Sequence, residues 1–305
     1  MKLITRSDFD GLVCAVLLKE VEQIDAIEFA HPKDVQDGEV AVTSNDILTN
    51  LPYVDGVGLW FDHHSSEEDR IGPDRGYKGE FEISPSAARV VYNFYKKKTD
   101  KLNRFSELLE SVDKYDAAQL DREDVTNPKG WILLAFILDP RTGLGYHRDY
   151  KISNRQLMRK MIDLIASHSV DEILEMPDVK ARIDRYFSSQ DAYSQFMRIH
   201  SKQIENLVVT DLRGVKNAPA GNRFSIYLIF PQTNISLRIF DGKQGKNVVV
   251  AGGYSIFNRT ANTDLGALFA RYGGGGHKAS GTCQLEIEES VDIINTIVGK
   301  IVLEG

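Results

Sequence analysis

The sequence has few cysteines and no long apolar run, and each shortage excludes a class of protein. Its 2 cysteines, Cys14 and Cys283, lie far apart among 305 residues. This supports neither a disulfide framework nor a zinc motif, so we expect both to be small buried residues. No stretch reaches the roughly 20 apolar residues of a membrane helix, and Lys2–Thr5 is strand-like rather than typical of a signal peptide. We therefore expect a cytoplasmic protein without membrane partners.

The sequence also lacks an excess of positive charge. Its 37 Lys and Arg residues are outnumbered by 44 Asp and Glu residues, which gives a formal net charge of −7. A protein that binds along many nucleotides needs clustered basic residues, so long duplex nucleic acid is excluded as a partner. A local arginine or a glycine-rich loop can still hold one phosphate group in an acidic protein.

The first part of the chain alternates short apolar runs with helical patterns. The runs that predict strands are Met1–Thr5, Ile27–Ala30, Glu39–Thr43 and Val57–Phe61. Helical spacing of apolar residues appears over Gly11–Val21, and residues 102–200 are mainly helical in pattern. We predict an α/β domain over residues 1–190, with a mainly parallel sheet flanked by helices.

The pattern changes after about residue 205. Strands are predicted at Leu207–Thr210, Phe224–Phe230, Ile235–Phe240 and Val248–Ala251, followed by helices at Asp264–Tyr272 and Ser290–Leu303. These runs are separated by Gly, Pro and Asn, which mark turns. We predict a smaller α/β domain with a mixed sheet over residues 207–305, joined to the first by a helical linker over residues 191–206.

Acidic residues and histidines follow the predicted strands. The residues concerned are Asp8, Asp10, Asp46, Asp62, His63 and His64, with Asp113 and Asp116 near the end of a later helix. The carboxyl ends of strands in an open α/β sheet form its binding edge, so residues distant in sequence meet there. Carboxylates mixed with imidazoles suit Mn²⁺ or Mg²⁺, which favour attack of hydroxide on phosphorus. The pattern therefore predicts a metal-dependent phosphoesterase.

Two of these motifs have ordinary alternatives. Asp8-Phe9-Asp10-Gly11 is also typical of a solvated turn, and Asn45-Asp46 also suits a turn or a helix cap. Asp62-His63-His64 is more specific. Successive side chains of a strand point to opposite faces, so two adjacent imidazoles cannot both be core residues on one face.

In this order, the motifs resemble the DHH phosphoesterase family with a DHHA1 C-terminal domain. The resemblance includes the acidic turn, Asp46, Asp62-His63-His64, the later aspartate pair and Gly273–His277. The family includes RecJ-type exonucleases, nano-RNases, pAp phosphatases, cyclic-dinucleotide phosphodiesterases and proteins labelled exopolyphosphatase-related. The resemblance spans nearly the whole chain.

The resemblance implies a role for each matching residue. The implied metal ligands are Asp8, Asp10, Asp46, His63 and Asp116, with Asp113 as the rival of Asp116. Asp46 would bridge two Mn²⁺ ions, with Mg²⁺ as the alternative metal. His64 would face the substrate phosphate, and Asp62 would orient an imidazole.

One position departs from the family pattern. Arg6 stands where the family's first motif has a histidine, and a guanidinium cannot ligate a metal. Three arrangements follow: His31 supplies the missing nitrogen, the site keeps extra water, or Arg6 grips phosphate beside a single metal. His31 also fits an ordinary surface residue before Pro32.

The second domain is expected to grip the substrate. A run of glycines lets backbone N–H groups approach an anion, although such a run also marks a flexible loop. The expected substrate-binding residues are Arg259, Gly274, Gly275, Gly276 and His277. The arginine would clamp a terminal phosphate, because a planar guanidinium offers paired donors.

The sequence predicts a metal-dependent phosphoesterase that hydrolyses a small phosphorylated substrate. Short single-stranded oligonucleotides, pAp, cyclic dinucleotides and polyphosphate ends all fit, and a cleft between two domains would set the substrate's length. The alternative is a nucleotide-binding regulatory protein whose catalysis is weakened by Arg6. Because many relatives pair, a homodimer is also compatible with the sequence.

Overall fold

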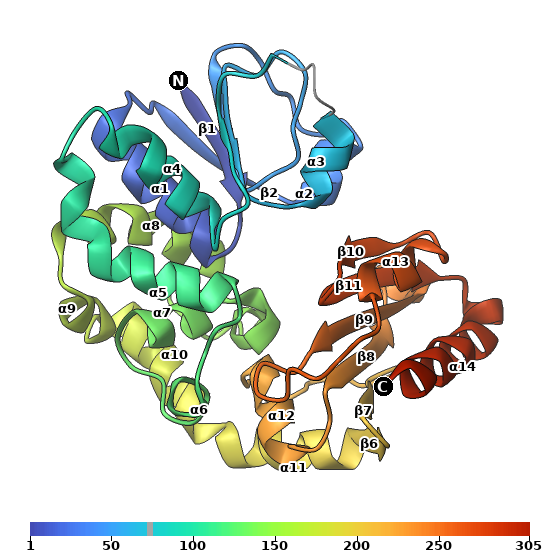
Figure 1. The fold of residues 1–305 in the computed structure, drawn as a ribbon. Helices are drawn as coiled ribbons and strands as arrows, with labels where there is room; N and C mark the ends of the chain where they lie inside the picture. Colours follow the sequence, from blue (N-terminus) through green and yellow to red (C-terminus); the bar gives the residue numbers. More distant parts are fainter. Residues whose placement is uncertain (72–75) are drawn as a thin grey trace. The chain divides into compact units, whose positions relative to one another are not determined.

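The computed structural model describes residues 1–71 and 76–305, which form two compact units. The first unit contains residues 1–120, 128–140 and 144–184, and the second contains residues 121–127, 141–143 and 185–305. The boundary between Asp184 and Arg185 lies near the expected end of the first domain. Helices, rather than an irregular spacer, occupy the expected linker up to residue 200 (Figure 1).

The first unit contains a parallel five-stranded sheet, as predicted. Its order is β2-β1-β3-β4-β5. The strands are β1 (Lys2–Arg6), β2 (Ala26–Ala30), β3 (Asp46–Thr49), β4 (Leu59–Asp62) and β5 (Gly79–Phe81). Neighbouring strands are all parallel, so their carboxyl ends lie at one edge of the sheet.

Helices cover both faces of this sheet (Figure 1). The helices of the first unit are α1 (Phe9–Val21), α2 (Pro32–Gln36), α3 (Ser66–Ile71), α4 (Ala87–Lys96), α5 (Ser106–Asp116), α7 (Gly130–Leu138), α8 (Asn154–Ser167), α9 (Val170–Leu174) and α10, which begins at Pro177 and ends at Ser188. Helices α1 and α4 pack together on one face. On the other face, Val35 of α2 and Ile71 of α3 join a buried cluster with Trp60.

One predicted strand of the first unit is wrong. Residues Glu39–Thr43 are irregular, and the third strand instead begins at Asp46. Val40 and Val42 produce the alternating pattern because both are partly buried against the cluster of Trp60. Both valines belong to a loop, and the described backbone forms no strand there. The true strand, Asp-Ile-Leu-Thr, is buried at every position and therefore shows no alternation.

The second unit contains a mixed six-stranded sheet, also as predicted. Its order is β10-β11-β9-β8-β7-β6, and among the described strands of this second sheet only the β7–β8 pair is parallel. The strands are β6 (Ser201–Ile204), β7 (Leu207–Asp211), β8 (Ile235–Asp241), β9 (Val248–Tyr254), β10 (Gly275–His277) and β11 (Ser280–Leu285). The helices are α6 (Arg122–Thr126), α11 (Gln190–His200), α12 (Ile226–Ile229), α13 (Leu265–Ala270) and α14 (Ile287–Glu304).

The core of the second unit lies between its sheet and two helices. Phe269 of α13 and Ile297 of α14 share a buried cluster with alternate residues of the strands, such as Leu237 and Val250. The predicted strand Phe224–Phe230 is wrong, since these residues form a helical turn and α12. The side chain of Asn222 accepts a hydrogen bond from the Phe224 N–H and starts this turn.

Both cysteines are buried and free, as expected. In the described chain no helix is long and apolar enough to cross a membrane.

Two neighbouring glycines of the Gly273–Gly276 run give a stability test. A Cβ at Gly274 would lie 2.1 Å from the Thr282 carbonyl oxygen, whereas one at Gly275 would have nothing within 4 Å. We predict that Gly274→Ala lowers the free energy of unfolding by about 1–3 kcal/mol, because the hairpin must open to accept the methyl group. Gly275→Ala should have little effect. Urea unfolding followed by circular dichroism measures both; equal losses would contradict the packing described.

Candidate metal and phosphate site

Three polar segments meet at the carboxyl edge of the first sheet. Arg6 ends β1, Asn50 follows β3, and Asp62 ends β4. Because β1, β3 and β4 are adjacent and parallel, these residues lie side by side at that edge. Helix α1 begins next to the same edge, and Gly11 allows its close approach, since a Cβ there would lie 2.1 Å from the Arg6 carbonyl oxygen.

Asp10 is the buried acidic residue of this edge. Its side chain lies in the first turn of α1, and the residue is 1% exposed. The Ala87 N–H donates to Oδ2 at 2.9 Å and the Ala88 N–H donates to Oδ1 at 2.8 Å. These donors favour the carboxylate, but burial, with the nearby charges of Asp116 and Asp8, raises the pKa of Asp10 well above its usual value. A cation bound next to Asp10 would stabilise its ionised carboxylate and so lower this pKa again.

His63 points a ring nitrogen at two carboxylates. Its Nδ1 lies 2.9 Å from the Ser84 carbonyl oxygen. A carbonyl only accepts, so Nδ1 carries the proton and Nε2 carries the lone pair. Nε2 is buried, makes no hydrogen bond, and lies 3.7 Å from Asp10 Oδ2 and 3.4 Å from Asp116 Oδ2. Such an orphaned acceptor next to carboxylates fits a metal ligand.

Asp116 completes a group of three side chains that could hold a metal ion. It is the last residue of α5, and ligand atoms from Asp10, His63 and Asp116 all lie within 4.8 Å of one another. Burial raises the pKa of Asp116, while the neighbouring His63 lowers it. Because the Asp116 side chain is still 30% exposed, water moderates the effect of burial. Two carboxylates and one imidazole suit Mn²⁺ or Mg²⁺.

Asp113 lies one turn earlier on α5 and has different partners. Its Oδ1 accepts from Ser86 Oγ at 2.6 Å, and its Oδ2 accepts from Arg89 Nε at 2.8 Å. Ser86 in turn caps α4, the helix whose first N–H groups hold Asp10. The structure therefore brings Asp116 to the cluster and uses Asp113 to fix α4.

Asp46, expected to bridge two metals, does not reach this edge. It is the first residue of β3 and pairs in register with Lys2, at the amino ends of the strands. Its Oδ2 accepts hydrogen bonds from the backbone N–H and the hydroxyl of Thr43. At about 3.3 Å per residue, it lies roughly 13 Å from Asn50, the residue that follows the strand. The prediction failed because the strand was placed before Asp46.

Asn50 occupies the position expected for Asp46, and sequence reasoning missed it. It follows β3, is 1% exposed and adopts a φ of 53°, which asparagine tolerates better than most residues. Its Nδ2 donates to Asp8 Oδ1 at 3.0 Å, while its Oδ1 is buried without a hydrogen bond. The usable signal was the short run Ile47-Leu48-Thr49, which ends just before Asn50.

Asp8 is held by three groups of this chain. Its Oδ1 accepts from the Gly11 N–H at 2.9 Å, which makes Asp8 the N-cap of α1. Its Oδ2 lies 2.9 Å from Arg6 Nε. With Asn50 added, both oxygens of Asp8 are engaged. Asp8 is thus at the site but not in the three-ligand cluster.

His64 and Asp62 form a pair beside the cluster. His64 Nδ1 lies 2.8 Å from Asp62 Oδ1, and Asp62 is 1% exposed. A carboxylate only accepts, so Nδ1 carries the proton and Nε2 is the atom that exchanges a proton. The side chain of His64 is 22% exposed, which gives a substrate access to it.

His31 lies at the same sheet edge, one strand further out. It follows β2, whose last residue pairs in register with Arg6. Its Nδ1 accepts from the Lys33 N–H at 3.1 Å and caps α2. The described residues contain two groups of side chains that could hold a metal ion, Asp10-His63-Asp116 and Asp62-His63-His64. His31 belongs to neither group. Its role as a substitute ligand stays a prediction.

The expected substrate residues of the second unit lie at one end of its sheet. Gly275 and Gly276 form β10 with His277, so the glycine run is half of a hairpin and not an open loop. The Tyr254 N–H donates to the Ala279 carbonyl at 2.8 Å, which joins the end of β9 to the hairpin turn. The exposed Arg259 follows β9, and its Nε donates to the Ile256 carbonyl at 3.2 Å.

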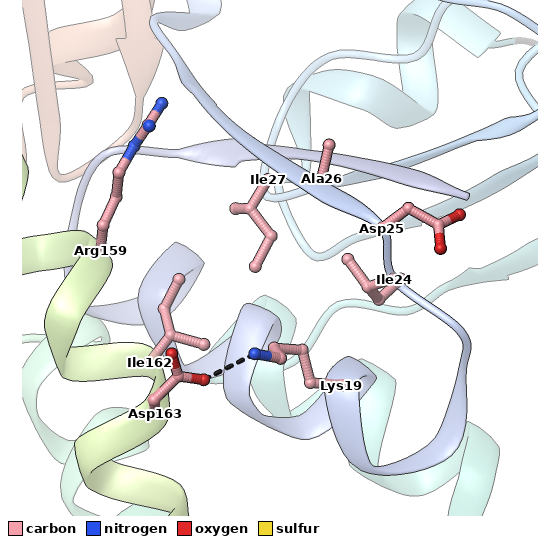
Figure 2. Close-up of a pocket in the computed structure, with 8 residues that line it drawn as sticks. All are labelled: Lys19, Ile24, Asp25, Ala26, Ile27, Arg159, Ile162 and Asp163. Carbon is pink, nitrogen blue, oxygen red and sulfur yellow. Dashed lines mark hydrogen bonds and ion pairs between the residues drawn. The ribbon is translucent and has the colours of Figure 1, made fainter.

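A separate cavity of about 230 Å³ lies in the first unit, away from this edge (Figure 2). Ala26 and Ile27, at the amino end of β2, line it together with α1 and α8. Its charged groups include an ion pair between Lys19 Nζ and Asp163 Oδ1 at 2.6 Å. It contains none of the expected ligands.

Two aspartates at opposite ends of the sheet give a direct test of the metal site. We predict that Asp10→Asn weakens Mn²⁺ binding at least about 100-fold, because ligand loss removes several kcal/mol of binding. The matched Asp46→Asn should leave Mn²⁺ affinity unchanged and cost only about 1 kcal/mol of stability through its bonds to Thr43. Titration calorimetry on metal-free protein measures both. Loss of binding in Asp46→Asn alone would contradict the site.

Comparison with known proteins identifies the family of this chain. No family model and no curated protein matches the sequence. Among solved structures, the chain is similar to the pGpG-specific phosphodiesterase PggH from Vibrio cholerae, with 45% identity, coverage of 100% of this chain and 99% of that chain, and a TM-score of 0.79.

Two more distant structures share the fold. A DHH domain from a member of the s1p family of ribosomal proteins is 12% identical, over 99% of this chain and 86% of that chain, with a TM-score of 0.57. RecJ from Thermus thermophilus, in complex with Mn²⁺, is 13% identical over 98% of this chain and 51% of that chain, with a TM-score of 0.52. With the whole-chain identity to PggH and the two observed sheets, these findings show that the chain belongs to the DHH/DHHA1 family of phosphoesterases.

Proposed function

We propose that this chain is a metal-dependent phosphodiesterase that hydrolyses linear dinucleotides, with pGpG as the preferred substrate and Mn²⁺ as the cofactor. Two observations support the proposal: 45% identity over the whole chain to a pGpG-specific phosphodiesterase, and the buried, unbonded Nε2 of His63 facing two carboxylates. Mg²⁺ is the alternative ion, since the same oxygen-rich ligands accept it.

Asp10, His63 and Asp116 would hold the cation. When bound, a divalent cation lowers the pKa of its water and neutralises charge on a phosphoryl oxygen. The Ser84 carbonyl keeps the proton of His63 on Nδ1 and so keeps Nε2 available as a ligand. The two N–H groups of α4 hold Asp10 in one orientation.

Hydrolysis of pGpG needs one proton donor and one nucleophile. Water adds to phosphorus, the bond from phosphorus to the ribose O3′ breaks, and the O3′ takes a proton, which gives two molecules of GMP. In this proposal His64 donates that proton from Nε2, and Asp62 stabilises the positive charge of the ring through Nδ1. Neither residue is needed to hold the cation.

Turnover of pGpG with a His64 variant tests this function. We predict that the wild-type chain with Mn²⁺ converts pGpG to GMP, and that His64→Asn lowers kcat about 100-fold or more, because a general acid contributes that much. Mn²⁺ affinity should not change. Chromatography of products from pGpG, pAp, polyphosphate and cyclic dinucleotides measures the preference. Binding of pGpG without turnover would favour a regulatory protein instead.

Arg259 is the residue proposed to recognise the 5′-phosphate. A guanidinium suits this dianion, and the side chain is exposed after β9. We predict that Arg259→Gln raises KM for pGpG about tenfold, which corresponds to about 1.4 kcal/mol. KM for GpG, which lacks the 5′-phosphate, should change little. The control is Arg213→Gln, because Arg213 is a surface residue paired with Asp211 at 2.6 Å. An equal rise for GpG would contradict the assignment.

A further inference from the structure

We infer that the site holds one divalent cation per chain, and that Arg6 serves as a fixed positive charge where a second cation would bind at Asp8. Arg6 then contacts the substrate's phosphate directly. This inference deepens the proposed phosphodiesterase function and rests on it for the role of Arg6. The number of bound cations can be measured whether or not the protein turns over a dinucleotide.

The first argument is that groups of this chain already occupy Asp8. Its Oδ1 accepts from the Gly11 N–H at 2.9 Å and from Asn50 Nδ2 at 3.0 Å, and its Oδ2 forms an ion pair with Arg6 Nε at 2.9 Å. A second cation at Asp8 would have to displace these donors or lie beside a guanidinium, which stays protonated in proteins. Because the guanidinium of Arg6 stays charged at any working pH, it repels a second cation at every such pH.

The second argument is the chemistry of Asn50. Its Nδ2 faces Asp8 Oδ1, and this fixes the amide, because the opposite orientation would place two acceptors together. Its Oδ1 is therefore turned away from Asp8, and this atom is buried without a hydrogen bond. A neutral amide oxygen can complete the shell of one cation, but it lacks the charge with which a carboxylate holds two.

The third argument is the balance of charge. Within the cluster of Asp10, His63 and Asp116, the two carboxylates carry two negative charges, while Asp8 outside it is paired with Arg6. One divalent cation provides the two positive charges that these carboxylates need.

Arg6 is also placed to meet a substrate. Its side chain is 37% exposed, compared with 19% for Asp8, so the guanidinium lies at the outer side of the pair. It forms an ion pair with Asp8, and its charge also lowers the pKa of Asp116. The ion pair through Nε holds the group in place, and its two terminal nitrogens are the ones with which arginine grips phosphate.

Counting bound Mn²⁺ on the full-length, metal-free protein tests the inference. Free Mn²⁺ is followed by electron paramagnetic resonance during titration. We expect one Mn²⁺ per wild-type chain, and one in Asp8→Asn and in the control Asp46→Asn. The double variant Arg6→His with Asn50→Asp should bind two, with the spectrum of an exchange-coupled pair. Two Mn²⁺ per wild-type chain, reduced to one in Asp8→Asn, would overturn the inference.

The role of Arg6 is tested by kinetics and by the same count. Arg6→Gln should raise KM for pGpG about tenfold while the count stays at one, and Arg6→Lys should restore part of the affinity. Unchanged KM in Arg6→Gln would overturn the phosphate contact. If no dinucleotide is turned over, the proposed function fails, whereas the measured number of cations still decides the first part.

Discussion

The buried carboxylate of Asp10 is the constraint on which the site depends. It is 1% exposed, accepts two backbone N–H groups from α4, and lies near the carboxylate of Asp116. Burial of this negative charge beside another is unfavourable, as the raised pKa of Asp10 reflects. His63 adds a lone pair directed at the same space. A divalent cation would satisfy all three side chains at once, and no protein donor in the described chain does so.

The surrounding contacts keep that arrangement rigid. Asp113 binds Ser86 and Arg89, and Ser86 caps the helix that presents its N–H groups to Asp10. The Ser84 carbonyl fixes the tautomer of His63. These groups do not touch the proposed cation, yet they decide where its ligands lie, which is how most metal sites are tuned.

Sequence reasoning located the site by one rule, that functional residues follow parallel strands. The rule placed Asp10 and His63 at the carboxyl edge of the sheet, where the structure also has them, because their motifs follow short, well-delimited apolar runs. It failed for Asp46, because partly buried valines of a loop imitated a strand and shifted the assignment by several residues. The choice between Asp113 and Asp116 was also beyond the sequence, since both lie on one helix and only packing shows which faces His63.

The same reasoning detected Arg6 as unusual but could not connect it to Asn50, because that link depends on the register of β1 and β3. Together they suggest a site in which protein charge replaces a metal ion. Crystals soaked in Mn²⁺ and measured at the manganese absorption edge test this most directly. The account predicts one anomalous peak per chain, among Asp10, His63 and Asp116. A peak at Asp8, or two peaks close together, would contradict it.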